Sequence, residues 1–196
     1  MKLATDQVSH REMAIILSEL NRVIKDNVDG DVVEMGCYEG GSAVAMQEVL
    51  AKFGYPKGLW LYDSFEGLPE KTNEDESSAG ESFKSGELKA SKARLERNFF
   101  KRDLQIPEIK KAWFFELDPE DLPEKIALAF LDGDYYESIM DSLKLVWPKM
   151  SSGGVILVDD FDNVALPGVK RAVEEFFSDY EVGYDYRESL AIIRIL

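Results

Sequence analysis

The sequence predicts an α/β fold in which a mostly parallel sheet is covered by helices on both faces. Short apolar runs alternate with segments of helical periodicity along most of the 196 residues. The runs are apolar on both faces, as the strands of a covered parallel sheet are. The chain then ends in two β-rich runs, 181–187 and 190–196, whose short connection at Glu188-Ser189 predicts an antiparallel hairpin.

The length and the composition fit one domain. Of the 196 residues, 45% are hydrophobic, which is enough for a single core. We expect residues 1–196 to form this domain, with 1–28 as an N-terminal helical cap and the polar stretch 71–91 as a mobile loop. No apolar run is long enough to cross a bilayer, and the charged start does not resemble a signal peptide, so a cytoplasmic location without membrane contact is expected.

The elements are expected in a regular order along the chain. Apolar residues have helical spacing from Ser9 to Lys25, and Ser9 and Glu12 have the spacing of a capping box. Strands are then expected at 31–35, 58–63, 110–117, 126–132 and 154–160. Helices are expected between and after them at 42–53, 92–100, 136–147 and 167–180.

Charge and residue usage exclude several classes of function. The formal net charge of −15 would repel a phosphate backbone, so no nucleic-acid partner is expected. The chain has one cysteine, Cys37, and one histidine, His10, which cannot form an internal disulfide or a cysteine-rich zinc site. Any bound metal would therefore have oxygen ligands.

A glycine-rich segment follows the first expected strand. In open α/β sheets, ligands bind beyond the carboxyl ends of the strands. Gly36 permits a tight turn there, and Gly40 and Gly41 leave backbone N–H groups at the start of the next helix open to a carboxylate. Glu34 favours a nearby ammonium group over a pyrophosphate. Glycine turns of this kind also serve plain strand-to-helix packing.

Asp63 ends the second expected strand and is followed by Ser64 and Phe65. An acid at this place can accept hydrogen bonds from two ribose hydroxyls, and Phe65 can flank an adenine ring. The same arrangement would serve NAD. The alternative is that Asp63 only caps a turn.

Acidic residues follow the next two expected strands, in the segments LDGD (131–134) and VDD (158–160). Neighbouring strand ends would bring Asp132, Asp159 and Asp160 together, and such carboxylates repel one another unless a cation joins them. Mg²⁺ suits oxygen ligands and would lower the pKa of a bound hydroxyl. The alternative is that Asp159 or Asp160 caps a loop.

With these residues in place, the chain resembles the macrocin O-methyltransferase family (TylF and MycF type), which are Mg²⁺-dependent sugar O-methyltransferases. The resemblance runs from Ser9 to Asp160 and is most specific in LYDSFEGLPE (61–70) and LDGDYYES (131–138). It implies a Rossmann-like class I methyltransferase fold, with a seven-stranded sheet in the order 3-2-1-4-5-7-6. It also implies S-adenosylmethionine and Mg²⁺ as cofactors.

The resemblance implies roles for the matching residues. Cofactor contacts are implied for Glu34, Gly36, Cys37, Tyr38, Gly40, Gly41, Ser42, Asp63, Ser64, Phe65, Trp113, Phe114 and Asp132. Metal ligands are implied at Asp132, Asp159 and Asp160. Asp132 is the expected catalytic base and Asp134 the second candidate. The acceptor is expected to be a small molecule, namely a sugar or a glycosylated natural product.

Alternatives stay open at this point. The acceptor could be a catechol-like diol, and the chain could be a cofactor-binding module without catalysis. An NAD-dependent dehydrogenase is disfavoured because Tyr38 replaces the second glycine of G-x-G-x-x-G. The apolar residues Met13, Ile16 and Leu20 either cover the domain or meet a second subunit, and a homo-oligomer is plausible from the resemblance.

Overall fold

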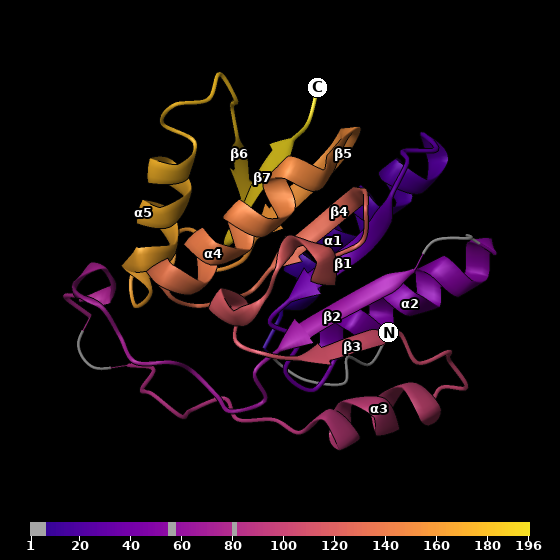
Figure 1. Ribbon diagram of the computed structural model, residues 1–196, viewed down its shortest axis with the longest axis horizontal. Coiled ribbons are helices and arrows are strands. Elements are labelled where there is room, and N and C mark those ends of the chain that lie inside the picture. The colour runs from indigo at the N-terminus through magenta and orange to yellow at the C-terminus, as the bar shows by residue number, and fades with distance from the viewer. Residues whose placement is uncertain (1–6, 55–57, 80–81) are drawn as a thin grey trace.

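The computed structural model describes residues 7–54, 58–79 and 82–196. Within these ranges the chain forms a seven-stranded sheet with helices on both faces (Figure 1). The strand order is β3-β2-β1-β4-β5-β7-β6, as the resemblance implies. Strands β1 to β5 are parallel, β7 is antiparallel to β5, and β6 pairs with β7 as the expected hairpin.

The strands are β1 (Asp31–Met35), β2 (Leu59–Asp63), β3 (Glu108–Lys111), β4 (Ile126–Leu131), β5 (Met150–Val158), β6 (Asp185–Arg187) and β7 (Leu190–Arg194). The helices are α1 (His10–Lys25), α2 (Gly41–Phe53), α3 (Lys92–Phe100), α4 (Tyr136–Val146) and α5 (Pro167–Phe176). Short 3₁₀ turns are η1 (Asn73–Asp75), η2 (Phe114–Glu116), η3 (Pro119–Asp121) and η4 (Trp147–Lys149). Among the described residues, no helix has both the length and the apolar character needed to cross a bilayer.

Most elements lie close to where the sequence predicts them, but three strands differ in extent. Strand β5 begins at Met150 rather than at residue 154, β6 covers only Asp185–Arg187 of the run 181–187, and β3 is displaced from its expected range. The capping box before α1 is formed, because the Ser9 N–H donates to Glu12 Oε2 over 2.7 Å and the Glu12 N–H donates to Ser9 Oγ over 3.3 Å. The strand expected at 110–117 is wrong in extent, because β3 ends at Lys111. The chain leaves the sheet at Trp113, whose N–H donates to the carboxylate of Glu116 over 2.9 Å, and the following residues form η2.

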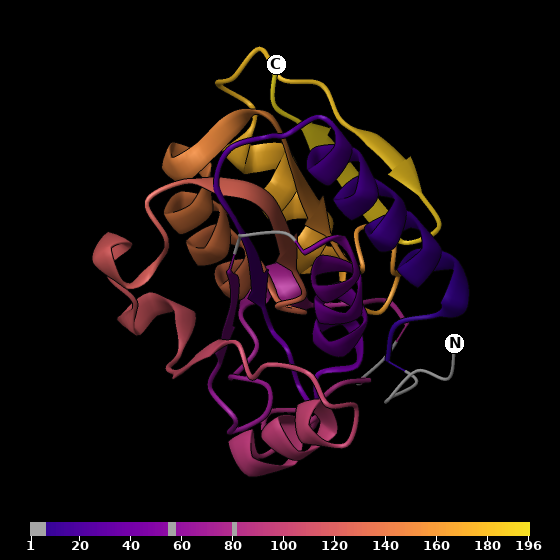
Figure 2. The same cartoon turned by 90° about the vertical axis from the view of Figure 1, so that its right-hand side faces the viewer.

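Alternate residues of the central strands pack on opposite faces of the sheet. Leu128 and Phe130 of β4 pack with α1, α2 and α3, whereas Ala129 and Leu131 pack with α4 and α5. Figure 2 shows the two helical layers, with the indigo helix α1 on one side of the sheet and the orange helix α4 on the other. The sheet is therefore covered on both faces, as its apolar strands predict.

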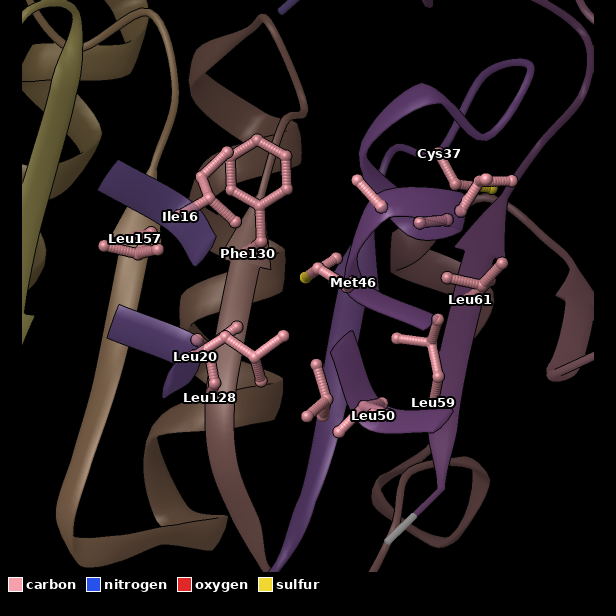
Figure 3. Packing of buried hydrophobic residues seen from close by; sticks show 14 of the residues in the cluster. Ile16, Leu20, Cys37, Met46, Leu50, Leu59, Leu61, Leu128, Phe130 and Leu157 are labelled. Carbon is pink, nitrogen blue, oxygen red and sulfur yellow. The ribbon is translucent and has the colours of Figure 1, made fainter. Parts of the chain in front are cut away.

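The apolar face of α1 belongs to the core of the domain. Met13, Ile16 and Leu20 are at most 2% exposed. Figure 3 shows Ile16 and Leu20 lying over β4 and β5, close to Leu128 and Leu157. These three residues therefore cover the sheet of their own chain, and the expected homo-oligomer stays a prediction.

The register of the parallel strands brings their carboxyl ends to one edge of the sheet. Hydrogen bonds continue past the strands, since the Gly36 N–H donates to Tyr62 O over 2.9 Å and the Asp132 N–H to Met35 O over 2.8 Å. The Asp159 N–H similarly donates to the carbonyl of the last residue of β4 over 2.9 Å. The first residues after β1, β4 and β5 are thus fixed side by side.

The segment after β2 is tied to the helices through Asp75, a carboxylate that is only 1% exposed. Figure 1 shows this magenta segment running from β2 towards one end of α5. Asp75 Oδ1 accepts from the Tyr136 N–H over 2.8 Å, and Oδ2 accepts from the N–H and hydroxyl of Thr72 over 3.0 Å each. Tyr135, the N-cap of α4, makes no side-chain cap bond, so Asp75 supplies the cap from a distant loop.

The same carboxylate touches the start of α5. A Cβ atom on Gly168 would lie 2.0 Å from Asp75 Oδ1, so only glycine fits there. Arg171 of α5 also donates to the carbonyl of Glu74 over 2.7 Å. Residues 71–79 are therefore docked on α4 and α5, while the mobility expected for 71–91 stays a prediction. Residues 80–81 of the expected mobile loop and residues 1–6 of the expected N-terminal helical cap lie outside the described ranges.

We expect Gly168→Ala to lower the free energy of unfolding by about 1–3 kcal/mol, because the added methyl group would push against Asp75. Gly183→Ala is the matched control, since no atom lies within 4 Å of its built Cβ and its stability should barely change. Equilibrium denaturation in urea measures both variants. Equal stability of the two would contradict the tight packing of Asp75 between α4 and α5.

Candidate functional site

A cavity of about 820 Å³ opens at the carboxyl edge of the sheet. Its wall is formed by the turns after β1, β2, β4 and β5, by the aromatic run after β3, and by one face of α4. The described lining carries a strong excess of negative charge, with a single lysine, Lys144, facing eight carboxylates. These are Asp63, Asp132, Asp134, Glu137, Asp141, Asp159, Asp160 and Glu175.

The glycine turn after β1 brings the backbone to the edge of the cavity. Gly36 has φ +90°, and a Cβ there would lie 1.9 Å from the carbonyl oxygen of Asp132, so no other residue fits. Tyr38 also has a positive φ, and both residues line the cavity. Gly40, the N-cap of α2, has φ +80° and offers no side chain to the first N–H groups of α2. Those N–H groups therefore have no side-chain cap, although the residues at the start of α2 are buried and do not line the cavity.

Glu34 is fully buried beside this turn and lies off the cavity wall. One carboxylate oxygen accepts from the Ser42 hydroxyl, whereas Oε2 has no hydrogen-bond partner among the described residues. Burial raises the pKa of Glu34 to about 8, despite the bond from Ser42. A buried carboxylate with a free oxygen is costly and would be stabilised by a cationic group.

The other residues expected along this turn are placed behind it. Cys37, Gly40, Gly41 and Ser42 are not among the residues that line the cavity. Cys37 is buried, and burial raises the pKa of its thiol, so it is an inert packing residue.

Asp63 holds the glycine turn in place. Its Oδ2 accepts from the N–H groups of Cys37 and Tyr38 over 3.0 and 2.8 Å, and its Oδ1 accepts from the Phe65 N–H over 2.6 Å. Burial raises the pKa of Asp63, although these bonds oppose the rise. The turn-capping alternative is thus realised. A carboxylate has about four acceptor positions, so one remains for a ligand in the cavity.

The aromatic wall consists of Trp113, Phe114 and Phe115. The rings of Trp113 and Phe115 are stacked, with centroids 6.4 Å apart and planes 10° apart. Ser64 lines the cavity as expected, but Phe65 does not, because its ring is 5% exposed and packs in the core with α2 and α3. The expected place of Phe65 beside a ligand ring stays a prediction.

Sequence reasoning missed several apolar residues of the wall. Leu68, Phe83 and Leu88 come from the segment after β2, and Met140 comes from α4. The hydroxyl of Tyr135 donates to the carbonyl of Phe83 over 2.9 Å and fixes part of this wall. The sequence did carry a signal for Phe83 and Leu88, because they are apolar residues within the polar stretch 71–91.

Three carboxylates meet at one point in the cavity. Ligand oxygens of Asp132, Asp134 and Asp160 all lie within 4.8 Å of one another. Asp134 and Asp160 have left-handed backbones, with φ of 61° and 55°, and these turn their side chains back towards Asp132. The structure thus brings together two members of the expected triad, with Asp134 in place of Asp159.

No cation among the described residues balances the acidic cluster. Burial, followed by repulsion from Asp159, Asp134 and Asp160, raises the pKa of Asp132 well above its ordinary value. Burial and repulsion from Asp160 and Asp159 raise the pKa of Asp134 to about 8. Burial also raises the pKa of Asp160, opposed by a hydrogen bond from the Asn163 amide. The missing partner of such a cluster is a positive charge.

Asp159 lies beside the cluster and is engaged elsewhere. Its Oδ1 accepts from the Asp160 N–H over 2.9 Å and from the Ser189 hydroxyl over 2.9 Å. Burial, and then repulsion from Asp160 and Glu12, raises the pKa of Asp159 to about 7. Asp159 lines the cavity, so its expected role as a metal ligand stays a prediction.

Comparison with known proteins relates this site to one group of enzymes. The model of the family described as Macrocin-O-methyltransferase (TylF) matches residues 2–188. Demethyldecarbamoylnovobiocin O-methyltransferase of Streptomyces niveus is 32% identical over 167 residues, which are 82% of this chain and 63% of that enzyme. A tetracenomycin 4'-O-methyltransferase of Streptomyces olivaceus, whose named substrate carries a dimethoxy-α-L-rhamnosyl group, is 31% identical over 82% of this chain and 62% of its own length.

The chain therefore spans less than two thirds of the length of these curated relatives. Among solved structures, the O-methyltransferase NovP superposes with a TM-score of 0.82 and 28% sequence identity, covering 94% of this chain and 79% of NovP. The sheet order and this superposition identify the fold as that of class I methyltransferases. The family model, which matches nearly the whole chain, and the sequence identity to these relatives show that this chain belongs to the macrocin O-methyltransferase (TylF) family.

Proposed function

We propose that the chain is an S-adenosylmethionine-dependent O-methyltransferase that uses a divalent cation to methylate a sugar hydroxyl of a glycosylated natural product. One observation carries the proposal. One cavity joins a glycine turn and an aromatic wall to a cluster of carboxylates that has no counter-charge among the described residues. Family membership argues against the NAD-dependent dehydrogenase.

The residues around the glycine turn fit S-adenosylmethionine, which supplies an electrophilic methyl group on a positively charged sulfur. The uncapped N–H groups of α2 have the chemistry to hold the carboxylate of its amino-acid end, and the unpaired Oε2 of Glu34 has the chemistry to hold its ammonium group, although both lie behind the cavity wall. Asp63 retains an acceptor position for the ribose. The flat faces of Trp113 and Phe114 suit the adenine ring.

The acidic cluster fits a hard divalent cation such as Mg²⁺, because all its ligand atoms are carboxylate oxygens. Asp132 and Asp160 belong both to the observed cluster and to the triad expected from the resemblance. Asp134 or Asp159 would supply a third ligand. A cation held there would lower the pKa of the acceptor hydroxyl.

The acceptor hydroxyl must lose its proton during methyl transfer, and Asp132 and Asp134 are the candidate bases. Hydrogen bonds from other described residues reach neither carboxylate, so both can receive a proton. Burial and mutual repulsion raise the pKa of both carboxylates in the absence of a cation, so Asp132 stays the first candidate and Asp134 the second.

The charge of the cavity narrows the class of acceptor. Among the described residues of its lining, carboxylates far outnumber lysines, of which Lys144 is the single one. The ammonium group of Lys144 already lies 3.7 Å from the carboxylate of Asp141. An acceptor that carries a diphosphate would be repelled. A neutral or cationic sugar is favoured, in keeping with the rhamnosyl group named for one relative. No observation in the cavity favours a catechol-like diol.

We expect the purified chain to bind S-adenosylhomocysteine with one-to-one stoichiometry in a calorimetric titration. With Mg²⁺ and S-adenosylmethionine, it should methylate neutral glycosides and leave nucleotide-diphosphate sugars unmodified, as mass spectrometry would show. Absence of binding would contradict the proposal at its first step. Binding without transfer to any hydroxyl acceptor would instead support the non-catalytic module.

Removing the carboxylate of either Asp132 or Asp160 should abolish cation binding. We expect Asp132→Asn and Asp160→Asn each to lose Mg²⁺ binding, because both side chains face the cluster and Asn is nearly isosteric. Asp160→Asn, which is not an expected cofactor contact, should keep its affinity for S-adenosylhomocysteine. Calorimetry with Mg²⁺ measures the first property. Unchanged Mg²⁺ affinity in both variants would refute the proposed metal site, and the larger loss between Asp134→Asn and Asp159→Asn would identify the third ligand.

The raised pKa of Asp134 predicts how stability depends on pH. Its pKa is about 8 in the folded protein, against an ordinary value of 3.8, so the folded state binds more protons between these values. Stability from this group is therefore complete below about pH 4 and is lost as the pH rises towards 8. The thermal midpoint of the metal-free protein should fall less between pH 5 and pH 8, roughly, in Asp134→Asn than in the wild type. If the thermal midpoints of the two proteins fall equally over this pH range, the raised pKa of Asp134 is contradicted.

A further inference from the structure

The turn between β6 and β7 holds the segment that follows β5. The carbonyl of Ser189 accepts from the Phe161 N–H over 2.7 Å, and the Ser189 hydroxyl lies 2.9 Å from Asp159 Oδ1. The same Asp159 oxygen accepts from the Asp160 N–H. Ser189 therefore contacts the chain on both sides of Asp160, although it does not line the cavity.

Asp160 needs such support, because its backbone is in a conformation that few residues other than glycine adopt. With φ at 55°, Asp160 turns its side chain towards the acidic cluster. Surrounding contacts must stabilise this conformation. Asn163 supplies one from within the loop, since its amide donates to Asp160 Oδ1 over 2.9 Å. Ser189, in the turn between β6 and β7, contacts Asp159 and Phe161 on the two sides of Asp160.

Glu12 of α1 holds Ser189 from the opposite side. Its Oε1 accepts from the Ser189 hydroxyl over 2.5 Å, and its Oε2 accepts from the Ser9 N–H in the capping box. Burial opposes the charge of Glu12, but hydrogen bonds from Ser189 and Ser9 outweigh it and lower the pKa of Glu12. Glu12 is thus a charged acceptor on a helix that is anchored in the core.

The hydroxyl of Ser189 lies between two carboxylates but has a single hydrogen. It cannot donate fully to both Glu12 and Asp159 when both are charged. A glutamine at position 12 would remove this competition. Its amide group could donate to the Ser189 oxygen, its carbonyl could accept from Ser9, and the hydroxyl hydrogen would be free for Asp159.

From these contacts we infer that Ser189 is a positioning residue for the acidic pair Asp159–Asp160, and that Glu12 fixes Ser189 in this role. The inference rests on the proposed metal-assisted function. It extends that site to the N-terminal turn of α1 and to the terminal hairpin, which lie 177 residues apart in the sequence. Residues that orient metal ligands in this way control affinity for the ion without touching it.

The test measures binding of Mn²⁺ in the presence of S-adenosylhomocysteine, by the electron paramagnetic resonance signal of the free ion. Ser189→Ala should weaken Mn²⁺ binding roughly 10- to 100-fold, and Ser189→Thr should restore it, because threonine keeps the hydroxyl. Ser18→Ala, an exposed serine of α1, is the matched control and should bind as the wild type does. Affinity for S-adenosylhomocysteine should be the same in all four proteins.

A second pair of variants tests the role of Glu12 even if Ser189→Ala does not fold. Ser9→Ala and Glu12→Ala both break the capping box, but only the latter removes the contact with Ser189. We expect weaker Mn²⁺ binding in Glu12→Ala alone, and wild-type or tighter binding in Glu12→Gln.

The outcomes separate this inference from the proposed function. If the wild type binds S-adenosylhomocysteine but no Mn²⁺, the proposed metal site and the positioning role both fail. If the wild type binds Mn²⁺ and Ser189→Ala and Glu12→Ala bind it equally well, only the positioning role fails. Equal losses in Ser9→Ala and Glu12→Ala would also overturn it, because helix capping would then explain the effect.

Discussion

The close approach of the turns after β1 and β4 is the constraint on which the site depends. At Gly36 the two backbones are so near that a single methyl group would collide with the carbonyl of Asp132. This contact places the glycine turn directly beside the acidic loop. A donor held at the glycine turn and an acceptor held at the carboxylates can therefore share one cavity, and neither half of the site could be moved without the other.

The acidic end of the cavity is maintained at a cost to the folded state. Asp132 and Asp134 are half-buried on the cavity wall, repel one another and lack donors among the described residues, and the fully buried Glu34 adds an unpaired oxygen nearby. Unpaired buried charges of this kind persist where a ligand completes them. The protein without ligands thus keeps a region of unfavourable electrostatics, which binding of cationic groups would relieve.

The sequence alone predicts the sheet well, because apolar runs and their spacing depend on local periodicity. It predicts Asp132 and Asp160 at one place for the same reason, since both follow neighbouring parallel strands. Asp134 joins them because its own backbone is left-handed, and the periodicity of the sequence does not reveal such a conformation. Phe65 faces the core through a similar positive φ, which sequence spacing could not show. The contact of Glu12 with Ser189 joins the two ends of the chain and depends on tertiary packing alone.

Asp75 limits how the loop that forms part of the cavity wall can be replaced. The wall of the cavity formed by Leu68, Phe83 and Leu88 comes from a loop whose inward-facing acid also caps α4 and abuts Gly168 of α5. That loop is not an independent module. Grafting a different loop onto this chain to accommodate another sugar would uncap a helix unless the graft carried an acid in the same place. Engineering of acceptor choice is therefore better confined to side chains on either side of Asp75.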